Sequence, residues 1–451
     1  MSQILCVDVG STFTKGVLVD TTTGALVARA ETPTTVQTDV LDGYRTLRQL
    51  IAAQPITTDG DPRVVDEVLV SSSAGGGLRL AVVGYERRVT AEAGHRVGLS
   101  AGAKVVHVAA GELSGLDVRE LRAARPDVVL LVGGTDGGNA DVLLHNATRL
   151  ARMRVKTPIV VAGNVEVRDQ VAEVLASTGR RYVVTDNVLP RIGVIEPAGA
   201  RRAIREVFLE HVIGGKGLSR GRTFAHLVRA ATPDAVLAGV EVLAARHSGD
   251  VLVVDVGGAT TDVYSVIEPQ GEDATLRRHV VATMWAMRTV EGDLGMRWNA
   301  PTVVEAAGAE GLPVTPELEA YAERVGEATG HLPQDPGEHE HDATLARLAA
   351  VIAVRRHARP DRPTGDVRLV LGSGGVLRHG DLLSGGVRAG GRSVAADVLG
   401  AVTSDWAGGW RVPDRARVAV DRDYLLCAVG LLAEVDREAA GRVADRLLWH
   451  P

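Results

Sequence analysis

The chain has 451 residues, of which 45% are hydrophobic but only 3% aromatic, and it carries a net charge of −6 at pH 7. This length is more than one hydrophobic core usually serves, and a core of aliphatic side chains suits helices layered on sheets. The acidic balance, the lack of a basic stripe and the lack of an apolar run of about 18 residues argue against nucleic acid and membranes as partners. Cys6 and Cys427 lie in apolar runs, and the sequence starts without a basic leader, so we expect a cytoplasmic protein.

The N-terminal elements predict a β-meander. Within residues 4–30, a strand leads through a Gly/Ser/Thr turn into a second strand, and a TTTG hairpin turn leads into ALVARAE. A helix is predicted around residues 39–53, and DEVLVSSSAGGGLRLAVVG predicts a strand, a loop of small residues and another strand. We expect the first half of VTAEAGHRVGLSAGAKV to be helical.

Residues 117–213 follow a different pattern. Three apolar runs, PDVVLLVGG, TPIVVAGN and RRYVVTD, are each followed by a helical pattern. Consecutive βα units predict a small parallel sheet covered by helices, and we interpret this block as an inserted subdomain. Its LVGGTDGGN segment places Asp136 and Asn139 near a helix start, and we interpret it as a capped βα loop, with a third anion-binding turn as the alternative.

The second half of the chain predicts further helices and strands. TPDAVLAGVEVLAARHSG is helical, EPQGEDATLRRHVVATM predicts a hairpin, and TVEGDLGMR predicts a turn into a helix. Residues 330–342 are polar, acidic and proline-bearing, which predicts a solvated loop, and His339 and His341 there are weak metal candidates without a second cluster. DVRLVLGSGGVLRHG predicts a strand entering a glycine-rich turn, and the segment from DRDYLL to DRLL predicts one C-terminal helix.

Two stretches of the sequence are near copies of each other. ILCVDVGSTFTKGVLV from Ile4 and VLVVDVGGATTDVYSV from Val251 align without a gap and agree at seven of sixteen positions. Such a turn presents backbone N–H groups that favour a phosphate oxygen, and the hydroxyl groups of Thr12, Thr14, Thr260 and Thr261 can add donors to it. Asp8 and Asp255 at the strand ends fit a hydrated Mg²⁺ bound to that phosphate. Two copies predict two homologous domains, each with one anion turn. The candidate binding residues of the turns are Gly10, Ser11, Thr12, Thr14, Lys15, Gly257, Gly258, Ala259, Thr260 and Thr261.

A third glycine-rich turn lies in LVLGSGGVLRHG. It puts Gly372, Gly374 and Gly375 directly after a strand, where a nucleotide base or ribose could lie against the backbone. Leu377 stands where the dinucleotide fingerprint has its last glycine, and no G-x-x-x-x-G-K-[ST] string occurs. Neither a Rossmann NAD site nor a P-loop is therefore predicted.

These motifs carry a family resemblance. DVGSTFTK, DVGGATTD, GSGGVLR and AVGLL resemble, in order and spacing, the phosphate-1, phosphate-2, adenosine and second connecting motifs of the actin, hexokinase and Hsp70 ATPase superfamily. Within it the whole chain is similar to the glutamate mutase L family, accessory proteins of adenosylcobalamin-dependent glutamate mutase. The strings that carry this resemblance are SSSAGGGLR, TAEAG, LVGGTDGGNADVLLHNA, TVEGDLGMR and GSGGVLRHG.

The resemblance implies roles for individual residues. Asp8 and Asp255 would hold hydrated Mg²⁺ and ATP, and Lys15 would reach a phosphate unless it is a solvated strand residue. Glu92 matches the acidic residue of the first connecting helix in related activators, so it is the candidate for the water-side carboxylate, with an ordinary helix-surface glutamate as the alternative. Glu291 and Asp293 would lie near the nucleotide or simply favour a helix start.

The expected fold is α/β and actin-like (ribonuclease H-like), with two homologous domains around a nucleotide cleft and an inserted α/β subdomain. The expected segments are domain I at 1–116, the insert at 117–213, connecting helices at 214–245, domain II at 246–420 and a C-terminal helix at 421–451.

The expected function is Mg·ATP hydrolysis that remodels an adenosylcobalamin-dependent mutase and releases damaged cobalamin. A small-molecule kinase, a nucleotide-dependent scaffold and, more weakly, a hydantoinase-like hydrolase are the alternatives. The mutase served and the oligomeric state, including a homo-oligomer, stay open.

Overall fold

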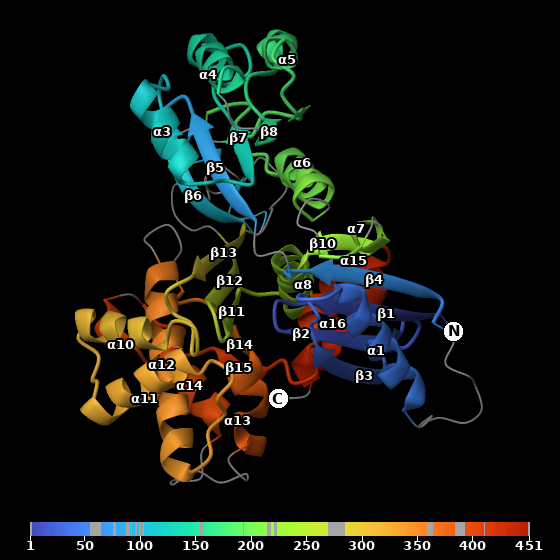
Figure 1. Cartoon of the computed structure of the whole chain (residues 1–451), viewed down its shortest axis with the longest axis vertical. Coiled ribbons are helices and arrows are strands. Elements are labelled where there is room, and N and C mark those ends of the chain that lie inside the picture. The colour runs from blue at the N-terminus through green and yellow to red at the C-terminus, as the bar shows by residue number, and fades with distance from the viewer. Residues whose placement is uncertain are drawn as a thin grey trace. The chain divides into compact units, whose positions relative to one another are not determined.

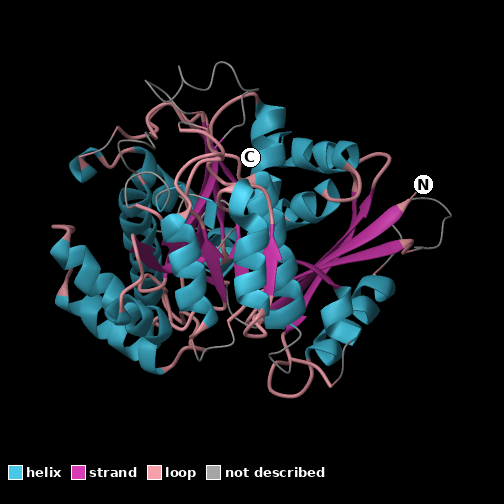
Figure 2. Cartoon of the chain, turned by 90° about the horizontal axis from the view of Figure 1, so that it is seen from above, coloured by secondary structure: helices cyan, strands magenta, loops and turns pink. Residues whose placement is uncertain are grey.

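The chain folds into two compact units (Figure 1). Unit 1 is built from Met1–Ala238 and Gly430–Asp436, and unit 2 from Gly239–Gln270, Met284–Val429 and Arg437–Pro451. This computed structural model describes residues 2–54, 65–74, 78–86, 91, 93–94, 97–98, 101, 103–153, 157–192, 194–213, 218–220, 223–268, 285–358, 364–383, 393–409 and 411–449. The chain contains both helices and strands (Figure 2), as the α/β prediction requires.

The first sheet of unit 1 contains the predicted meander. Its strand order is β10-β4-β1-β2-β3, in which β1, β2 and β3 pair antiparallel whereas β4 pairs parallel to β1 and to β10. The predicted helix is α1 (Val40–Ala53), and Asp39 begins it by accepting a hydrogen bond from the backbone N–H of Leu41. The strands are β1 (Gln3–Val9), β2 (Phe13–Asp20), β3 (Leu26–Pro33), β4 (Glu67–Ser72) and β10 (Val228–Ala231).

The sheet of unit 2 repeats this arrangement. Its order is β13-β12-β11-β14-β15, again with an antiparallel meander followed by two parallel strands. Because the second copy of the sequence repeat forms β11 and β12, as the first forms β1 and β2, the prediction of two homologous ribonuclease H-like domains is confirmed. The strands are β11 (Val251–Val256), β12 (Thr261–Ile267), β13 (Trp285–Glu291), β14 (Leu369–Ser373) and β15 (Arg417–Val420).

A third sheet, also in unit 1, confirms the predicted parallel α/β block. All its strands are parallel, in the order β6-β5-β7-β8-β9. One face packs against α3, α4 and α5 and the other against α6, as the upper part of Figure 1 shows. The strands are β5 (Arg79–Gly84), β6 (Lys104–Ala110), β7 (Val128–Leu131), β8 (Ile159–Val161) and β9 (Tyr182–Val184).

This third sheet reaches further towards the N-terminus than residues 117–213. Its strands β5 and β6 come from residues that the sequence analysis assigned to domain I, so the sheet is larger than the βα units alone suggested. The cause is visible in β5, which is buried on both faces as a central parallel strand must be. The domain boundaries themselves stay predictions.

The remaining helices cover these sheets or join the units. They are α3 (Gly115–Ala123), α4 (Asp141–Ala151), α5 (Arg168–Ala176), α6 (Ala198–Val207) with the π-helical turn Phe208–Ile213, α7 (Thr223–Leu227), α8 (Thr232–His247), α10 (Ala300–Ala309), α11 (Pro316–Glu327), α12 (Pro336–His357), α13 (Gly375–Leu383), α14 (Val394–Thr403), α15 (Leu425–Ala433) and α16 (Arg437–Trp449), with short 3₁₀ turns at Val165–Val167 and Trp406–Gly408. None of the described helices is both long and apolar enough to cross a membrane.

The prediction of a solvated loop over residues 330–342 is wrong for its second half. Helix α12 begins at Pro336 because the Asp335 side chain accepts a hydrogen bond from the backbone N–H of Glu338, at 2.9 Å. Proline is well tolerated in the first turn of a helix, where its missing N–H has no partner to lose. His339 and His341 therefore lie in the first turns of a helix. The predicted EPQGEDATLRRHVVATM hairpin lies mostly outside the described residues.

Replacing Asp335 with alanine should lower the free energy of unfolding by about 1 kcal/mol, because the N–H of Glu338 loses its acceptor. The control is Asp335→Asn, which keeps a side-chain oxygen at the cap and should stay close to the wild type. Denaturant midpoints measure both variants. An alanine variant as stable as the wild type would contradict the cap.

The predicted single C-terminal helix is two helices, α15 and α16. Helix α15 begins late because the buried carboxylate of Asp421 accepts hydrogen bonds from the backbone N–H groups of Leu425 and Leu426, at 2.7 and 3.0 Å. Burial raises the pKa of Asp421, although these two N–H groups oppose the shift. The break between the helices falls at Asp436, a residue type that favours helix N-termini over helix interiors.

Candidate phosphate and cation site

The first repeated turn connects β1 to β2 and has a tight backbone. The N–H of Gly10 donates to the carbonyl oxygen of Phe13 at 3.1 Å. A Cβ atom at Gly10 would lie 2.7 Å from that oxygen, so this position requires glycine. Ser11, Thr12 and Phe13 are exposed, so the side chains of this turn reach the surface.

The second repeated turn connects β11 to β12 and has the same hydrogen bond. The N–H of Gly257 donates to the carbonyl oxygen of Thr260 at 2.9 Å, and a Cβ atom at Gly257 would also lie 2.9 Å from that oxygen. Thr260 therefore takes the place that Phe13 has in the first turn. Gly258 and Ala259 take the places of Ser11 and Thr12, so this turn offers fewer hydroxyl groups.

Asp8 is held at the end of β1 by two hydroxyl groups. Ser71, its neighbour on β4, donates to Oδ1 at 3.2 Å, and Thr232 at the start of α8 donates to the same oxygen. The other oxygen, Oδ2, lies 3.8 Å from the Cβ position of Gly10, on the side of the turn. One anchored and one turn-facing carboxylate oxygen suit a hydrated Mg²⁺, which takes few direct protein ligands.

Asp255 has corresponding neighbours on β12 and β14. It lies beside Ser373 as Asp8 lies beside Ser71, but it faces Asp262 where Asp8 faces Lys15. Among the described residues no group of three or more His, Cys, Asp or Glu side chains could enclose a metal.

Two of the predicted hydroxyl donors, Thr14 and Thr261, are fully buried in their strands. Thr14 shares a 2.9 Å hydrogen bond with Thr34, and Thr261 donates to the carbonyl oxygen of Leu294 at 2.6 Å. These two hydroxyls stabilise the sheets, so the prediction that they donate to phosphate is wrong.

The comparisons with known proteins assign the family. The model of the family described as MutL protein matches residues 4–448. The chain belongs to the MutL protein family. Protein MutL of Clostridium tetanomorphum is 35% identical over 476 residues, which cover 99% of this MutL-family chain and 99% of that protein.

Solved structures resemble this MutL-family chain more distantly. Acetone carboxylase in a nucleotide-free form is similar over 96% of this chain and 70% of its own, with 14% identity and a TM-score of 0.39. ATP-dependent caprolactamase from Pseudomonas jessenii is similar over 95% of this chain and 70% of its own, with 16% identity and a TM-score of 0.39. Likeness at this level carries no conclusion, so the fold of this MutL-family chain rests on its strand order.

The third glycine-rich turn of the MutL-family chain has one open position. Gly372 is packed against Leu377 and Leu399 within the core, and Gly374, at φ +99°, lies directly against the carbonyl of Val256. Only Gly375, the first residue of α13, has nothing within 4 Å of its Cβ position. Gly372 and Gly374 are therefore required by close packing on their Cβ side, and ligand contact with the backbone of the three glycines stays a prediction.

The TVEGDLGMR segment supports the second turn. The N–H groups of Met296 and Arg297 donate to the carbonyl oxygens of Gly257 and Gly258, at 3.1 and 2.8 Å. Gly295 lies so close to the backbone of Ala259 that a side chain would overlap it. This backbone contact was not predicted, because the residue types of the segment do not indicate it.

Glu291 and Asp293 of the same segment are ion-paired and lie ahead of the helix. Both accept from Nη1 of Arg356 on α12, at 2.9 and 2.8 Å. Burial alone would lower the pKa of Arg356, but these carboxylates raise it. The helix α10 begins only at Ala300, so the expected helix-start role is wrong.

The other predicted features of the MutL-family chain have structural explanations or cannot be placed. Glu92 lies outside the described residues. Asp136 in LVGGTDGGN accepts from Asn187 at 2.8 Å and from the N–H of Val165 at 3.1 Å, while Asn139 accepts from the N–H of Asp141 at 2.9 Å. These contacts support the capped-loop interpretation.

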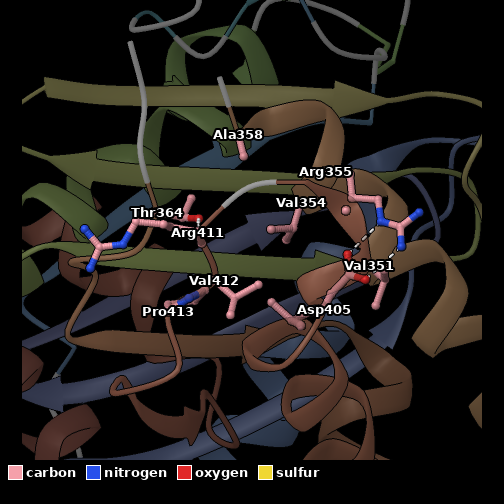
Figure 3. Close-up of a pocket in the computed structure, with 11 residues that line it drawn as sticks. Val351, Val354, Arg355, Ala358, Thr364, Asp405, Arg411, Val412 and Pro413 are labelled. Carbon is pink, nitrogen blue, oxygen red and sulfur yellow. Dashed lines mark hydrogen bonds and ion pairs between the residues drawn. The ribbon is translucent and has the colours of Figure 1, made fainter. Parts of the chain in front are cut away.

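An apolar pocket in unit 2 lies apart from the turns (Figure 3). Arg355 and Asp405, which both line it, pair through two hydrogen bonds of 2.6 and 2.7 Å, which Figure 3 draws as dashed lines. Its apolar lining comes from Val351, Val354, Ala358, Val402, Val412 and Pro413. None of the described predicted site residues lines it.

Proposed function

We propose that this chain binds Mg·ATP and hydrolyses it to remodel an adenosylcobalamin-dependent mutase of the glutamate mutase type. The observation that carries the proposal is the pair of equivalent turns, each with an aspartate at the strand end and a glycine whose N–H closes the turn. Membership of the MutL family supports the choice of client.

Each part of the nucleotide has candidate partners in the chain. The backbone N–H groups of the two turns would bind phosphate oxygens, and Lys15 would add a positive charge at the first turn. Asp8 and Asp255 would hold the water shell of Mg²⁺, which when bound neutralises phosphate charge. Phosphoryl transfer needs mainly positioning and charge neutralisation, so these contacts account for most of the chemistry.

The energy of the nucleotide would be used for a conformational change. A protein with two states is shifted by a ligand only as far as the ligand prefers one of them. ATP and ADP differ by the γ-phosphate, which the turns would contact. A mutase bound to one state would then be remodelled when that phosphate is lost, and damaged cobalamin would be released.

Phosphate release by the purified chain tests the hydrolysis step, with and without an adenosylcobalamin-dependent mutase. We expect release that depends on Mg²⁺ and rises with the mutase. Transfer of labelled phosphate to a metabolite would instead identify a kinase, and tight ATP binding without phosphate release would identify a scaffold.

Affinity capture tests the partner. The tagged chain should retain a cobalamin-binding mutase, and the amount retained should differ between Mg·ATP and Mg·ADP. Retention of no such mutase under either condition would refute the client assignment and leave the ATPase assignment to the assay above.

A further inference from the structure

A buried arginine, Arg288, lies on the strand that pairs with β12, the strand that follows the second turn. Arg288 on β13 is 5% exposed, and its guanidinium lies 5.6 Å from the ring centre of Tyr264. Its Nη2 donates to Oδ1 of Asp262 at 2.9 Å. Burial alone would lower the pKa of Arg288, but attraction to Asp262, with a smaller contribution from Asp255, raises it. The arginine is therefore charged and fixed beside the two carboxylates.

Asp262 connects Arg288 to the second turn, because it also contacts Thr260. Its other oxygen, Oδ2, is 3.2 Å from the hydroxyl of Thr260. In this contact the Thr260 hydroxyl is the donor and the carboxylate oxygen of Asp262 is the acceptor. The single hydroxyl proton is then used, and the oxygen of Thr260 has only lone pairs left for a ligand.

The first turn is built differently at the same positions. Lys15 takes the place of Asp262, and Phe13, with no hydroxyl, takes the place of Thr260. Arg29 is opposite Val17 as Arg288 is opposite Tyr264, yet Arg29 is exposed. The connected series Arg288, Asp262 and Thr260 therefore belongs to the second turn alone.

We propose that Arg288 and Asp262 are positioning residues that turn Thr260 into a hydrogen-bond acceptor, so that the second turn binds the water shell of a divalent cation through the Thr260 oxygen. This inference rests on the proposed function, because the cation is the Mg²⁺ that accompanies the nucleotide. It assigns Thr260 to the cation, whereas the sequence alone assigned its hydroxyl to phosphate. Water molecules on Mg²⁺ are strong donors and need acceptors of this kind.

The test compares nucleotide affinity with Mg²⁺ and without it, in EDTA, using calorimetry on the full chain. Thr260→Val keeps the shape of the side chain but removes its oxygen. We expect its ATP affinity to fall about tenfold in Mg²⁺ and to stay within about twofold of the wild type in EDTA. Thr260→Ser restores the hydroxyl and should restore the Mg²⁺-dependent affinity.

A second variant tests the positioning residues. In Asp262→Asn the side chain can donate through its amide group, so the hydroxyl of Thr260 is no longer obliged to donate. The difference between the Mg²⁺ and EDTA affinities should shrink as in Thr260→Val, and thermal melting checks that the variant is folded. In Asp262→Asn/Thr260→Val the two losses should not add, because both act on one contact.

Two failures are distinguishable. If Thr260→Val loses equal affinity in Mg²⁺ and in EDTA, Thr260 donates to phosphate and the inference is overturned while the proposed function stands. If the wild-type chain binds no ATP under either condition, the proposed function itself fails.

Discussion

Replacing Asp8 with alanine should lower the rate of Mg·ATP hydrolysis by about 100-fold or more. The carboxylate lies at the turn, with Oδ1 held by Ser71 and Thr232 and Oδ2 on the side of Gly10. Losing the charge removes a ligand for the water shell of Mg²⁺, and metal-assisted charge neutralisation is worth several kcal/mol, at about 1.4 kcal/mol for each tenfold in rate. Asp255→Ala should have a similar effect.

Asp8→Asn separates the charge from the structural role. Its amide oxygen can still accept from Ser71 and Thr232, so the fold at the end of β1 should survive. The rate should nevertheless fall nearly as far as in the alanine variant, because the amide is neutral. Phosphate release measured beside thermal melting checks both. Hydrolysis at the wild-type rate in Asp8→Ala or Asp255→Ala would refute the assignment of the turns.

Replacing Gly374 with alanine should destabilise unit 2 by about 3 kcal/mol. The residue has a backbone φ of +99°, which residues other than glycine rarely adopt, and a Cβ atom there would overlap the carbonyl oxygen of Val256. Strain of this kind costs about 1 to 3 kcal/mol, and overpacking adds a similar amount. Val256 leads directly into Gly257, so a shift there would also displace the second turn.

Gly375→Ala is the matched control for this prediction. The next residue along the chain has nothing within 4 Å of its Cβ position and begins α13. Alanine favours a helix over glycine, so stability should stay equal or rise by up to about 1 kcal/mol. Denaturant unfolding measures both variants. Equal stability of the two alanine variants would show that Gly374 is not constrained by its neighbours.

The sequence predicted what depends on local patterns. The near copies at Ile4 and Val251 each read as a strand, a turn with an aligned glycine (Gly10 or Gly257) and a second strand, and this local pattern predicted the antiparallel pair with its tight turn. The same patterns do not reveal which hydroxyl is buried. Thr14 and Thr261 each follow the last residue of a turn, and their burial is seen only in the structure, where they hydrogen-bond to Thr34 and to the carbonyl of Leu294.

Arg288 was missed although a signal for it exists. In both sheets the third strand places an arginine opposite the same position of the second strand, Arg29 opposite Val17 and Arg288 opposite Tyr264. A gapless alignment of the copies does not reach it, because the connection from β12 to β13 is longer than that from β2 to β3. Pairing the strands before aligning the copies would have found it.

The wrong prediction of a loop where α12 begins has a similar origin. Polar composition over residues 330–342 predicted a loop, yet Asp335 followed by Pro336 is a helix start, and the apolar spacing that identifies the helix begins only beyond it. Composition averages over a window, whereas a cap depends on one side chain and one N–H. Boundaries were therefore less predictable than the elements themselves.

Calorimetric titration of the full chain with ATP in the presence of Mg²⁺ tests the central claim most directly. We expect one nucleotide per chain and a weaker affinity when either Asp8 or Asp255 is replaced by alanine, since both turns are proposed to contribute to binding. Absence of binding by the wild-type chain, or an affinity unchanged in both variants, would contradict it.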